Sequence, residues 1–343
     1  MCNVVFCHPI SDYPPHILAR IINRLLEADG CAGSITFWEI NSSVESLTQT
    51  CNVIKKLQSE RGNRQFYIQV MMTGEALQEK EAHLLGQLGA VVGLLSQGLR
   101  SKKSHTTCTD LEQAYGQITG AANLLDRMAV PFYVVESVTP ISAPQITEAY
   151  QFFGAHGWRF QSYRPNYKLW KSAVTKKAEI YLAFLLNLFQ LWWEDRMRGN
   201  TVYIWEFDRL AGLFKGVPSI DRDEAGRRKS KNLITQDGTV YPSKEAMLSG
   251  DTLGNVMEMD FPMMEEQYLA RKRDFCGDPT ISDNCRGCRW AMLCGGNWDG
   301  WHGERNTVCS AYCRFYEFAV PRLMDLLREI GKNFPIPGTM LFE

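Results

Sequence analysis

Residues 66–95 read FYIQVMMTGEALQEKEAHLLGQLGAVVGLL, and this stretch decides the fold. Its first part, Phe66–Met72, and its last part, Ala90–Leu95, are short apolar runs typical of buried β-strands. Between them, residues 75–88 repeat apolar side chains at the spacing of an amphipathic helix. A strand, a helix and a second strand in this order predict two parallel strands joined by a right-handed crossover.

The same alternation continues on both sides of this stretch. Further strands are predicted at ITFWEI (35–40), FYVVESV (132–138) and FQSYRP (160–165), with helices at 16–26, 47–57, 110–128 and 145–154. We therefore expect an α/β fold with a parallel sheet, open or curled into a partial barrel, and ligands at the carboxyl ends of the strands. The alternation stops after a long helix at 180–198, so a domain boundary is expected near Gly199 or Gly216. The segment LITQDGTVYPS (233–243) predicts a β-hairpin centred on Asp237-Gly238.

Length and composition are those of an ordinary soluble protein. The 343 residues carry a formal net charge of -1 and a pI near 6.6, which predicts neither a nucleic-acid partner nor a membrane partner. The most apolar stretch, Ile180–Trp193, is interrupted by Asn187 and Gln190 and is too short to span a bilayer. It predicts a buried or interfacial helix. Eleven cysteines without an export signal predict a cytoplasmic protein.

Six of these cysteines lie near the C-terminus, at positions 276, 285, 288, 294, 309 and 313. Several thiolates held close together repel one another unless a metal ion or cluster neutralises them, so this density predicts a metal site. Cys285 and Cys288 can reach one ion from a tight turn, and Cys294 can join them. The fourth ligand can be Cys309 or Cys313. Zinc and [4Fe-4S] both accept four thiolates, and a disulfide framework is the alternative that the missing export signal disfavours.

The C-terminal part of the chain resembles a SPASM domain, the auxiliary-cluster module of radical S-adenosylmethionine (SAM) enzymes, and the whole chain resembles the anaerobic sulfatase-maturating enzymes. The resemblance implies a partial (β/α)6 barrel over residues 1–200 and a SPASM-like metal-cluster module with a C-terminal helix over residues 201–343. The segments that carry it are LEADG (26–30), LNLFQLWWEDRMRGNTVYIWEFD (186–208), DGTVYPS (237–243), LGNV (253–256), CRGCRWAMLCGG (285–296) and CSAYCRFYEFAVPRL (309–323).

The resemblance implies an enzyme that oxidises a serine or cysteine of a sulfatase to formylglycine, with a radical made from SAM at a Cys-x3-Cys-x2-Cys cluster. The chain departs from that motif. It begins MCNVVFCHP, and when it is aligned on the Cys-Asn start of the motif, Phe6 and Pro9 stand where cysteines are expected. Cys2 and Cys7 remain, and this alignment leaves no strand before the cluster loop.

The SAM contacts of the family are also replaced. Residues 38–41 (WEIN) stand in place of a GGEP segment, where bulky side chains would fill the space that glycines leave open. Residues 95–98 (LSQG) stand in place of a Ser-Leu-Asp-Gly segment. These replacements argue against SAM binding, and we assign no catalytic residue.

The two auxiliary clusters of the family differ in what is left of them here. One has lost its ligands, because their positions fall in the cysteine-free segment 219–231, at Ser243 and at Trp298. The aspartate that follows the hairpin cysteine in the family is replaced here by Lys244. The other keeps all four ligands that the resemblance implies. Cys309 is preferred over Cys313 because it stands twelve residues before Pro321, at the family's ligand position. The predicted metal ligands are Cys285, Cys288, Cys294 and Cys309.

These features predict a degenerate family member that keeps one [4Fe-4S] cluster, or zinc in its place, and acts as a pseudoenzyme binding a peptide or a protein partner. Such a partner would be a sulfatase or another maturase. The first alternative is an active radical enzyme with an unusual cluster that uses Cys2, Cys7 and His8, or with a complementing subunit. The second alternative is a zinc-stabilised binding protein.

Overall fold

Two compact units make up the chain. Unit 1 comprises residues 1–94, 120–132 and 228–279, and unit 2 comprises residues 95–119, 133–227 and 280–343. The computed structural model describes residues 3–7, 12–27, 33–38, 44–60, 66–75, 77–96, 108–170, 175–216, 232–242, 244–274, 288–290, 293 and 307–330.

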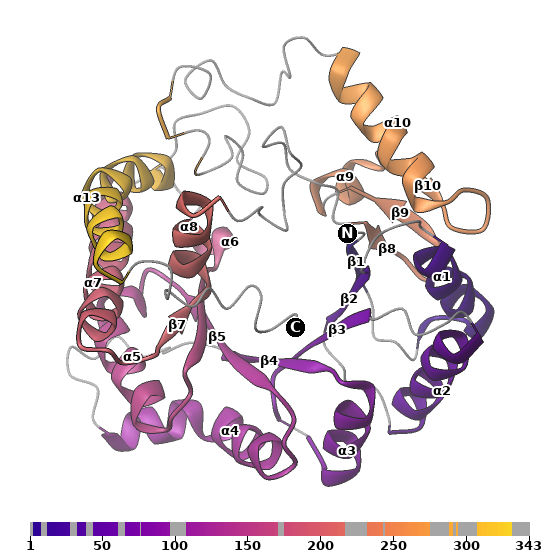
Figure 1. The fold of residues 1–343 in the computed structure, drawn as a ribbon, viewed down its shortest axis with the longest axis horizontal. Helices are drawn as coiled ribbons and strands as arrows, with labels where there is room; N and C mark the ends of the chain where they lie inside the picture. The colour runs from indigo at the N-terminus through magenta and orange to yellow at the C-terminus, as the bar shows by residue number, and fades with distance from the viewer. Residues whose placement is uncertain are drawn as a thin grey trace. The chain divides into compact units, whose positions relative to one another are not determined.

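Unit 1 is built on parallel strands with a hairpin added at one edge (Figure 1). The strands β1 (Asn3–Phe6), β2 (Gly33–Trp38), β3 (Phe66–Met72) and β4 (Val91–Ser96) pair in sequence order, and each pair is parallel. On the other side of β1 lie β8 (Leu233–Ile234), β9 (Thr239–Tyr241) and β10 (Gly254–Asn255). The strand β8 is parallel to β1, whereas β9 pairs with both β8 and β10 in an antiparallel manner.

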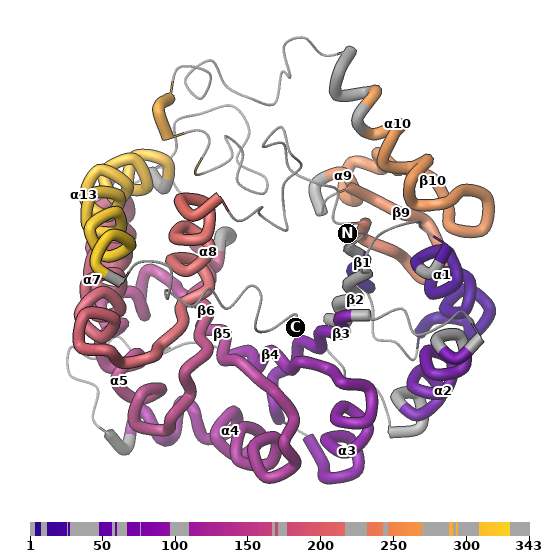
Figure 2. The backbone as a smooth tube through the Cα atoms, viewed as in Figure 1, coloured from indigo at the N-terminus to yellow at the C-terminus, as the bar shows by residue number. Residues whose placement is uncertain are grey.

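The helices of unit 1 confirm the predicted alternation. The helices α1 (Pro15–Glu27), α2 (Val44–Glu60) and α3 (Glu79–Leu88) connect successive strands and lie on one side of them (Figure 2). The helix α3 begins four residues later than the predicted start because Gln78 caps it. The backbone N–H of Gln78 donates to the Glu81 carboxylate at 3.0 Å, and Gly89 closes the helix at φ 64°. The helices α9 (Lys244–Ser249) and α10 (Phe261–Asp274) follow the hairpin.

The first strand corrects one expectation. The alignment on the cysteine motif left no strand before the cluster loop, yet Asn3–Phe6 forms β1 in register with Ser34–Phe37 of β2. Val4 and Phe6 are fully buried, since alternate residues of a strand point to the same face. The segment that the alignment matched to the cluster loop therefore includes a core strand, and the chain between β1 and α1 runs from Cys7 to Pro14.

The predicted hairpin is confirmed. The turn is closed by the backbone N–H of Gly238, which donates to the Thr235 carbonyl at 2.9 Å. Gly238 has a φ of 84°, and the hydroxyl of Thr235 donates to the Asp237 carboxylate at 2.7 Å. A side chain at position 238 would also approach Val256 to 2.9 Å, so glycine is required twice over. The pairing of β8 with β1, more than 200 residues away, was not predicted.

Unit 2 has its own parallel strands, β5 (Phe132–Val138), β6 (Phe160–Pro165) and β7 (Tyr203–Ile204), in which β6 pairs with both β5 and β7. One face of β5 and β6 is covered by an aromatic layer, in which Tyr163 of β6 contacts Phe153 at a ring-centroid distance of 6.2 Å. The helices of this unit are α4 (Cys108–Arg127, shared with unit 1), the 3-10 helix η2 (Ala143–Gln145), α5 (Ile146–Ala155), α6 (Tyr167–Trp170), α7 (Thr175–Met197), α8 (Trp205–Phe214) and α13 (Thr307–Ile330).

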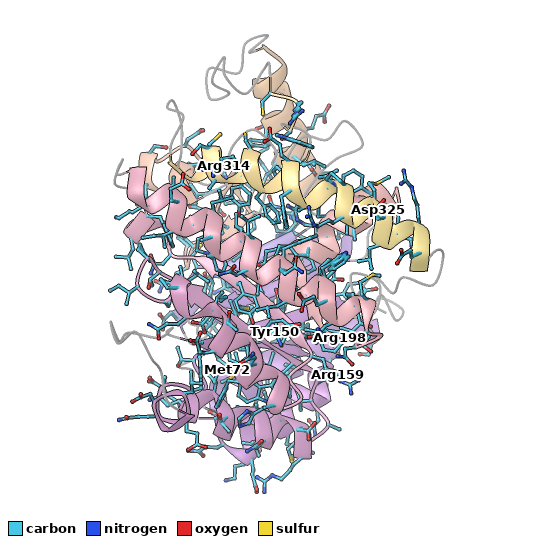
Figure 3. All side chains as sticks on the ribbon, turned by 90° about the vertical axis from the view of Figure 1, so that its left-hand side faces the viewer. Met72, Tyr150, Arg159, Arg198, Arg314 and Asp325 are labelled. Carbon is cyan, nitrogen blue, oxygen red and sulfur yellow. The ribbon has the colours of Figure 1, made fainter. Side chains whose placement is uncertain are left out.

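The long helices α7 and α13 lie side by side (Figures 1 and 3). The hydroxyl groups of Tyr181 and Tyr312 are 2.9 Å apart, and the ring of Phe189 is 5.7 Å from that of Phe315. Arg314, labelled near one end of α13 in Figure 3, forms an ion pair with Glu179 at 2.5 Å. The apolar stretch predicted as a buried or interfacial helix is thus the central part of α7, packed against α13.

In the part of the chain that the structure describes, no helix has the length and apolar character needed to cross a bilayer. The fold class, α/β with parallel strands, is confirmed. The division into domains at residue 200 stays a prediction, because the two compact units reflect packing within the chain and do not test it.

Candidate metal centre

Three cysteines come together at the start of α13. Cys309 and Cys313 are four residues apart on this helix, so both side chains lie on one face, one turn apart. The thiol of Cys313 interacts with those of Cys309 and Cys288, which belongs to a segment distant in sequence. We call Cys288, Cys309 and Cys313 the thiol trio. None of these three cysteines is joined in a disulfide.

The electrostatics of the thiol trio suit a soft metal. Burial, and then the neighbouring thiols of Cys309 and Cys288, raise the pKa of Cys313 to about 12. Without a cation, therefore, this thiol stays protonated at neutral pH, since a thiolate would be both desolvated and close to other sulfurs. A soft divalent ion or an iron–sulfur cluster would supply the missing positive charge, so the donor set fits either group in its chemistry.

The predicted ligands are placed only in part. Cys288 and Cys309 lie in the described residues and belong to the trio, whereas Cys285 and Cys294 lie outside them. Within the described ranges, no group of three or more His, Cys, Asp or Glu side chains is arranged to hold a metal ion. The four-cysteine set therefore stays a prediction.

The surroundings of the trio are aromatic. Trp290, two residues after Cys288, has its ring 5.8 Å from that of Tyr316 on α13. The guanidinium of Arg289 lies 4.7 Å from the Trp290 ring and forms an ion pair with Glu317 at 2.6 Å. These contacts attach the Cys288 segment to α13 about one turn after Cys313, which explains how residues 288 and 313 meet.

The end of β1 differs from this site. Cys7 follows β1, and its backbone N–H donates to the carbonyl of Ile234 at 3.1 Å and to the hydroxyl of Tyr13 at 3.0 Å. The Tyr13 hydroxyl in turn donates to the same Ile234 carbonyl at 2.6 Å. Tyr13 also packs edge-on against Phe6, with ring centroids 4.9 Å apart. One cysteine is present in the segment Cys7–Pro14, and its backbone is tied to β8.

Other positions singled out in the sequence are only partly described. Trp38 ends β2 and Ser96 ends β4, where Ser96 is buried. Lys244 is the first residue of α9. Cys2, His8 and Pro9 lie outside the described residues, as do residues 39–41, 97–98 and 219–231, Ser243, Cys276 and Trp298.

Two features of these sites were missed or left open by the sequence. The sequence left Cys309 and Cys313 as alternatives, whereas the structure brings both to Cys288; their spacing of four on a helix was the available signal. The role of Tyr13 had no local signal, because its partner Ile234 is 221 residues away.

Comparison with known proteins gives a consistent result. No family model matches the chain. The cysteine-type anaerobic sulfatase-maturating enzyme of Clostridium perfringens (strain 13) is 26% identical to it, and the match covers 96% of this chain and 95% of the relative. The corresponding enzyme of Clostridium novyi (strain NT) is 22% identical over 84% of this chain and 80% of that protein.

The solved structures that resemble the chain share its fold. Native anSMEcpe with bound AdoMet superposes with a TM-score of 0.76 and 22% identity, over 96% of this chain and all of that chain. A second structure of that protein, with bound AdoMet and the Cp18Cys peptide, gives the same TM-score of 0.76.

Proposed function

Because the chain belongs to the radical SAM family that includes the anaerobic sulfatase-maturating enzymes, we propose that it is a degenerate member which has lost radical chemistry and binds a peptide or protein partner. One observation carries this proposal. The segment that joins β1 to α1, Cys7–Pro14, contains a single cysteine. A cluster with one iron open to SAM needs three thiolates, and one thiol cannot hold it.

The structure around this segment supports the same proposal. Correcting the position of β1 does not restore the motif, because the cysteine motif of the family would follow the strand, and Phe6 is a core residue of that strand. The Tyr13 hydroxyl lies against the backbone of Cys7 and Ile234. The backbone at the end of β1 is thus engaged in hydrogen bonds with β8.

The retained metal site is proposed to be structural. Cys285, Cys288, Cys294 and Cys309 would hold one [4Fe-4S] cluster, with zinc as the alternative ion, and Cys313 lies beside them. A metal bound only by the folded chain adds its binding energy to folding, so such a site can be kept for stability alone. It would join the segment around Cys288 to α13 in a SPASM-like module.

Peptide binding is proposed from the relatives. The solved structures of anSMEcpe include complexes with the peptides Cp18Cys and Kp18Cys. This chain covers those structures nearly end to end. We propose a sulfatase segment or another maturase as the partner, in the cytoplasm, on a partial barrel like that of the family.

Metal analysis separates this function from its alternatives. The protein would be reconstituted anaerobically with iron and sulfide, desalted, and assayed for iron, sulfide and zinc. One cluster gives about four iron atoms per chain. About eight would indicate a second cluster and support an active enzyme, whereas zinc without iron after purification would support a zinc-stabilised binding protein.

A further inference from the structure

A group of polar side chains lies on one face of β5 and β6, towards the carboxyl ends of these strands. It consists of Ser137 on β5, Ser162 and Arg164 on β6, and Glu206 in the first turn of α8, and we call it the polar strip. Ser137 pairs with Arg164 in the register of the two strands, so their side chains lie on the same face. The opposite face carries Tyr163, which is packed against Phe153.

Hydrogen bonds hold the polar strip in place. The Ser162 hydroxyl donates to Oε1 of Glu206 at 2.7 Å, and Nε of Arg164 donates to Oγ of Ser162 at 3.3 Å. The backbone N–H of Tyr163 donates to both carboxylate oxygens of Glu206 at 3.2 Å. The strand β7 ends at Ile204, so it has no further residue to accept the N–H of Tyr163 on β6. The Glu206 carboxylate accepts that hydrogen bond instead. The Glu206 carboxylate is thereby fully engaged.

Two groups of hydrogen-bond donors on the polar strip are available to a ligand. In the described part of the chain, Nη1 and Nη2 of Arg164 and the hydroxyl of Ser137 have no hydrogen-bond partner, and Arg164 takes part in no ion pair there. Both residues are partly exposed. Burial raises the pKa of Glu206, which the positive charge of Arg164 opposes. Among the described residues, Arg164 therefore offers Nη1 and Nη2 as donors, near the Ser137 hydroxyl, and no carboxylate lies within ion-pair distance of them.

We infer that the polar strip binds a carboxylate of the peptide partner, with Nη1 and Nη2 of Arg164 on its two oxygens and the Ser137 hydroxyl as a third donor. The inference rests on the proposed function, since it names what the peptide must carry. A guanidinium matches a planar carboxylate in two parallel hydrogen bonds, and a bond from Nε to Ser162 fixes its orientation. The carboxyl ends of parallel strands are also where such sheets bind ligands.

A matched pair of small probes tests this inference without metal or SAM. N-acetyl-L-glutamate N-methylamide carries the carboxylate, and N-acetyl-L-glutamine N-methylamide replaces it with an amide of the same shape. Binding would be followed by chemical-shift changes in NMR titrations. We expect the acid to bind about tenfold or more tightly than the amide, as one lost charge-assisted interaction implies.

Three variants complete the test. Arg164→Gln should abolish the preference for the acid, whereas Arg164→Lys should keep part of it. Arg159→Gln is the matched control, because Arg159 is an exposed arginine just before β6, at the amino end of the strand (Figure 3). It should leave the preference unchanged. Circular dichroism and thermal unfolding would confirm that each variant is folded.

Equal binding of the two probes to the folded wild-type protein overturns the inference, as does an unchanged preference in Arg164→Gln. A third outcome concerns the source of the carboxylate. If SAM binds more tightly than decarboxylated SAM through Arg164, and the glutamate probe does not bind, the assignment to a peptide is overturned. Radical activity would instead refute the proposed function and leave the probe result standing, so the two failures are distinguishable.

Discussion

The start of α13 and the end of β1 both carry cysteines, and in the part of the chain that the structure describes three thiols meet at the start of α13. Cys309 and Cys313 share one face of α13, and aromatic contacts bring Cys288 to them. The sequence from Cys7 to Pro14 contains one cysteine, and the backbone N–H of Cys7 donates to the Ile234 carbonyl and the Tyr13 hydroxyl. From this difference we expect a metal where distant segments bring several thiols together, as at the thiol trio, and none at the end of β1.

The largest effect is expected when the thiol trio is broken. Cys288→Ser should lower bound iron from about four atoms per chain to near zero, because a serine hydroxyl is a poor ligand for a soft site. The stabilisation on reconstitution should be lost too, and structural metals contribute on the order of 10 kcal/mol. Iron analysis and thermal unfolding with and without reconstitution measure both.

The control for this variant is Cys51→Ala, which removes a buried cysteine of α2, on unit 1. It should cost stability through a small cavity but keep the metal. Full iron loading of Cys288→Ser would show that the trio is not part of the metal site, and the contrast between the two regions would fail.

The second effect is a loss of folding stability at alkaline pH, which arises in unit 2, the unit that contains the thiol trio. Burial raises the pKa of Tyr115, Tyr150 and Tyr163 above 10, and the hydrogen bond from Tyr150 to Asp195 adds to its shift. Since the folded pKa exceeds the unfolded value, the stabilisation is complete below pH 10 and is lost as the pH rises beyond it. The loss is about 1.4 kcal/mol per pH unit for each tyrosine.

Denaturant unfolding between pH 8 and pH 11.5 measures this loss. Tyr150→Phe is the matched variant, since it removes one ionisable group together with a hydrogen bond of 2.6 Å to Asp195. It should be less stable at pH 8 and should show a shallower decline above pH 10. A stability that does not change from pH 10 to pH 11.5 contradicts the burial of these hydroxyls.

The smallest effect is expected at the end of β1. Tyr13→Phe removes the hydroxyl that bonds to Ile234 and Cys7 but keeps the ring contact with Phe6. The Cys7 N–H keeps its bond to the Ile234 carbonyl, so the cost should be about 1 kcal/mol. Hydrogen exchange at Cys7 and on β8 should accelerate, while the metal content stays at the wild-type value. A loss of iron in Tyr13→Phe would show that the end of β1 contributes to metal binding, which contradicts the contrast drawn between it and the thiol trio.

The sequence predicted the parts of the fold that depend on local patterns. The strand at Phe66–Met72 was placed with its observed bounds, because apolar alternation and flanking polar residues act within a few residues. The strand β1 was missed because a motif alignment was given more weight than the apolar run Val4–Phe6. The pairing of β8 with β1 is non-local and has no counterpart in the local sequence.

The candidate site was predictable to a similar degree. From the sequence, Cys309 and Cys313 were alternative ligands with Cys309 preferred, whereas the meeting of both with Cys288 depends on contacts of Trp290 and Arg289 with α13. The polar strip had no sequence signal, because Arg164 and Glu206 are 42 positions apart. Glu206 reaches Ser162 on β6 because β7 is short and ends at Ile204, two residues before it.

The central claim is that this chain cannot generate a radical from SAM, and its most direct test is the formation of 5'-deoxyadenosine. The reconstituted protein, with its metal content measured, would be incubated anaerobically with SAM and a strong reductant, with and without peptide, and analysed by liquid chromatography and mass spectrometry. We predict no 5'-deoxyadenosine above a metal-free control. Its repeated formation in proportion to the protein would contradict the account.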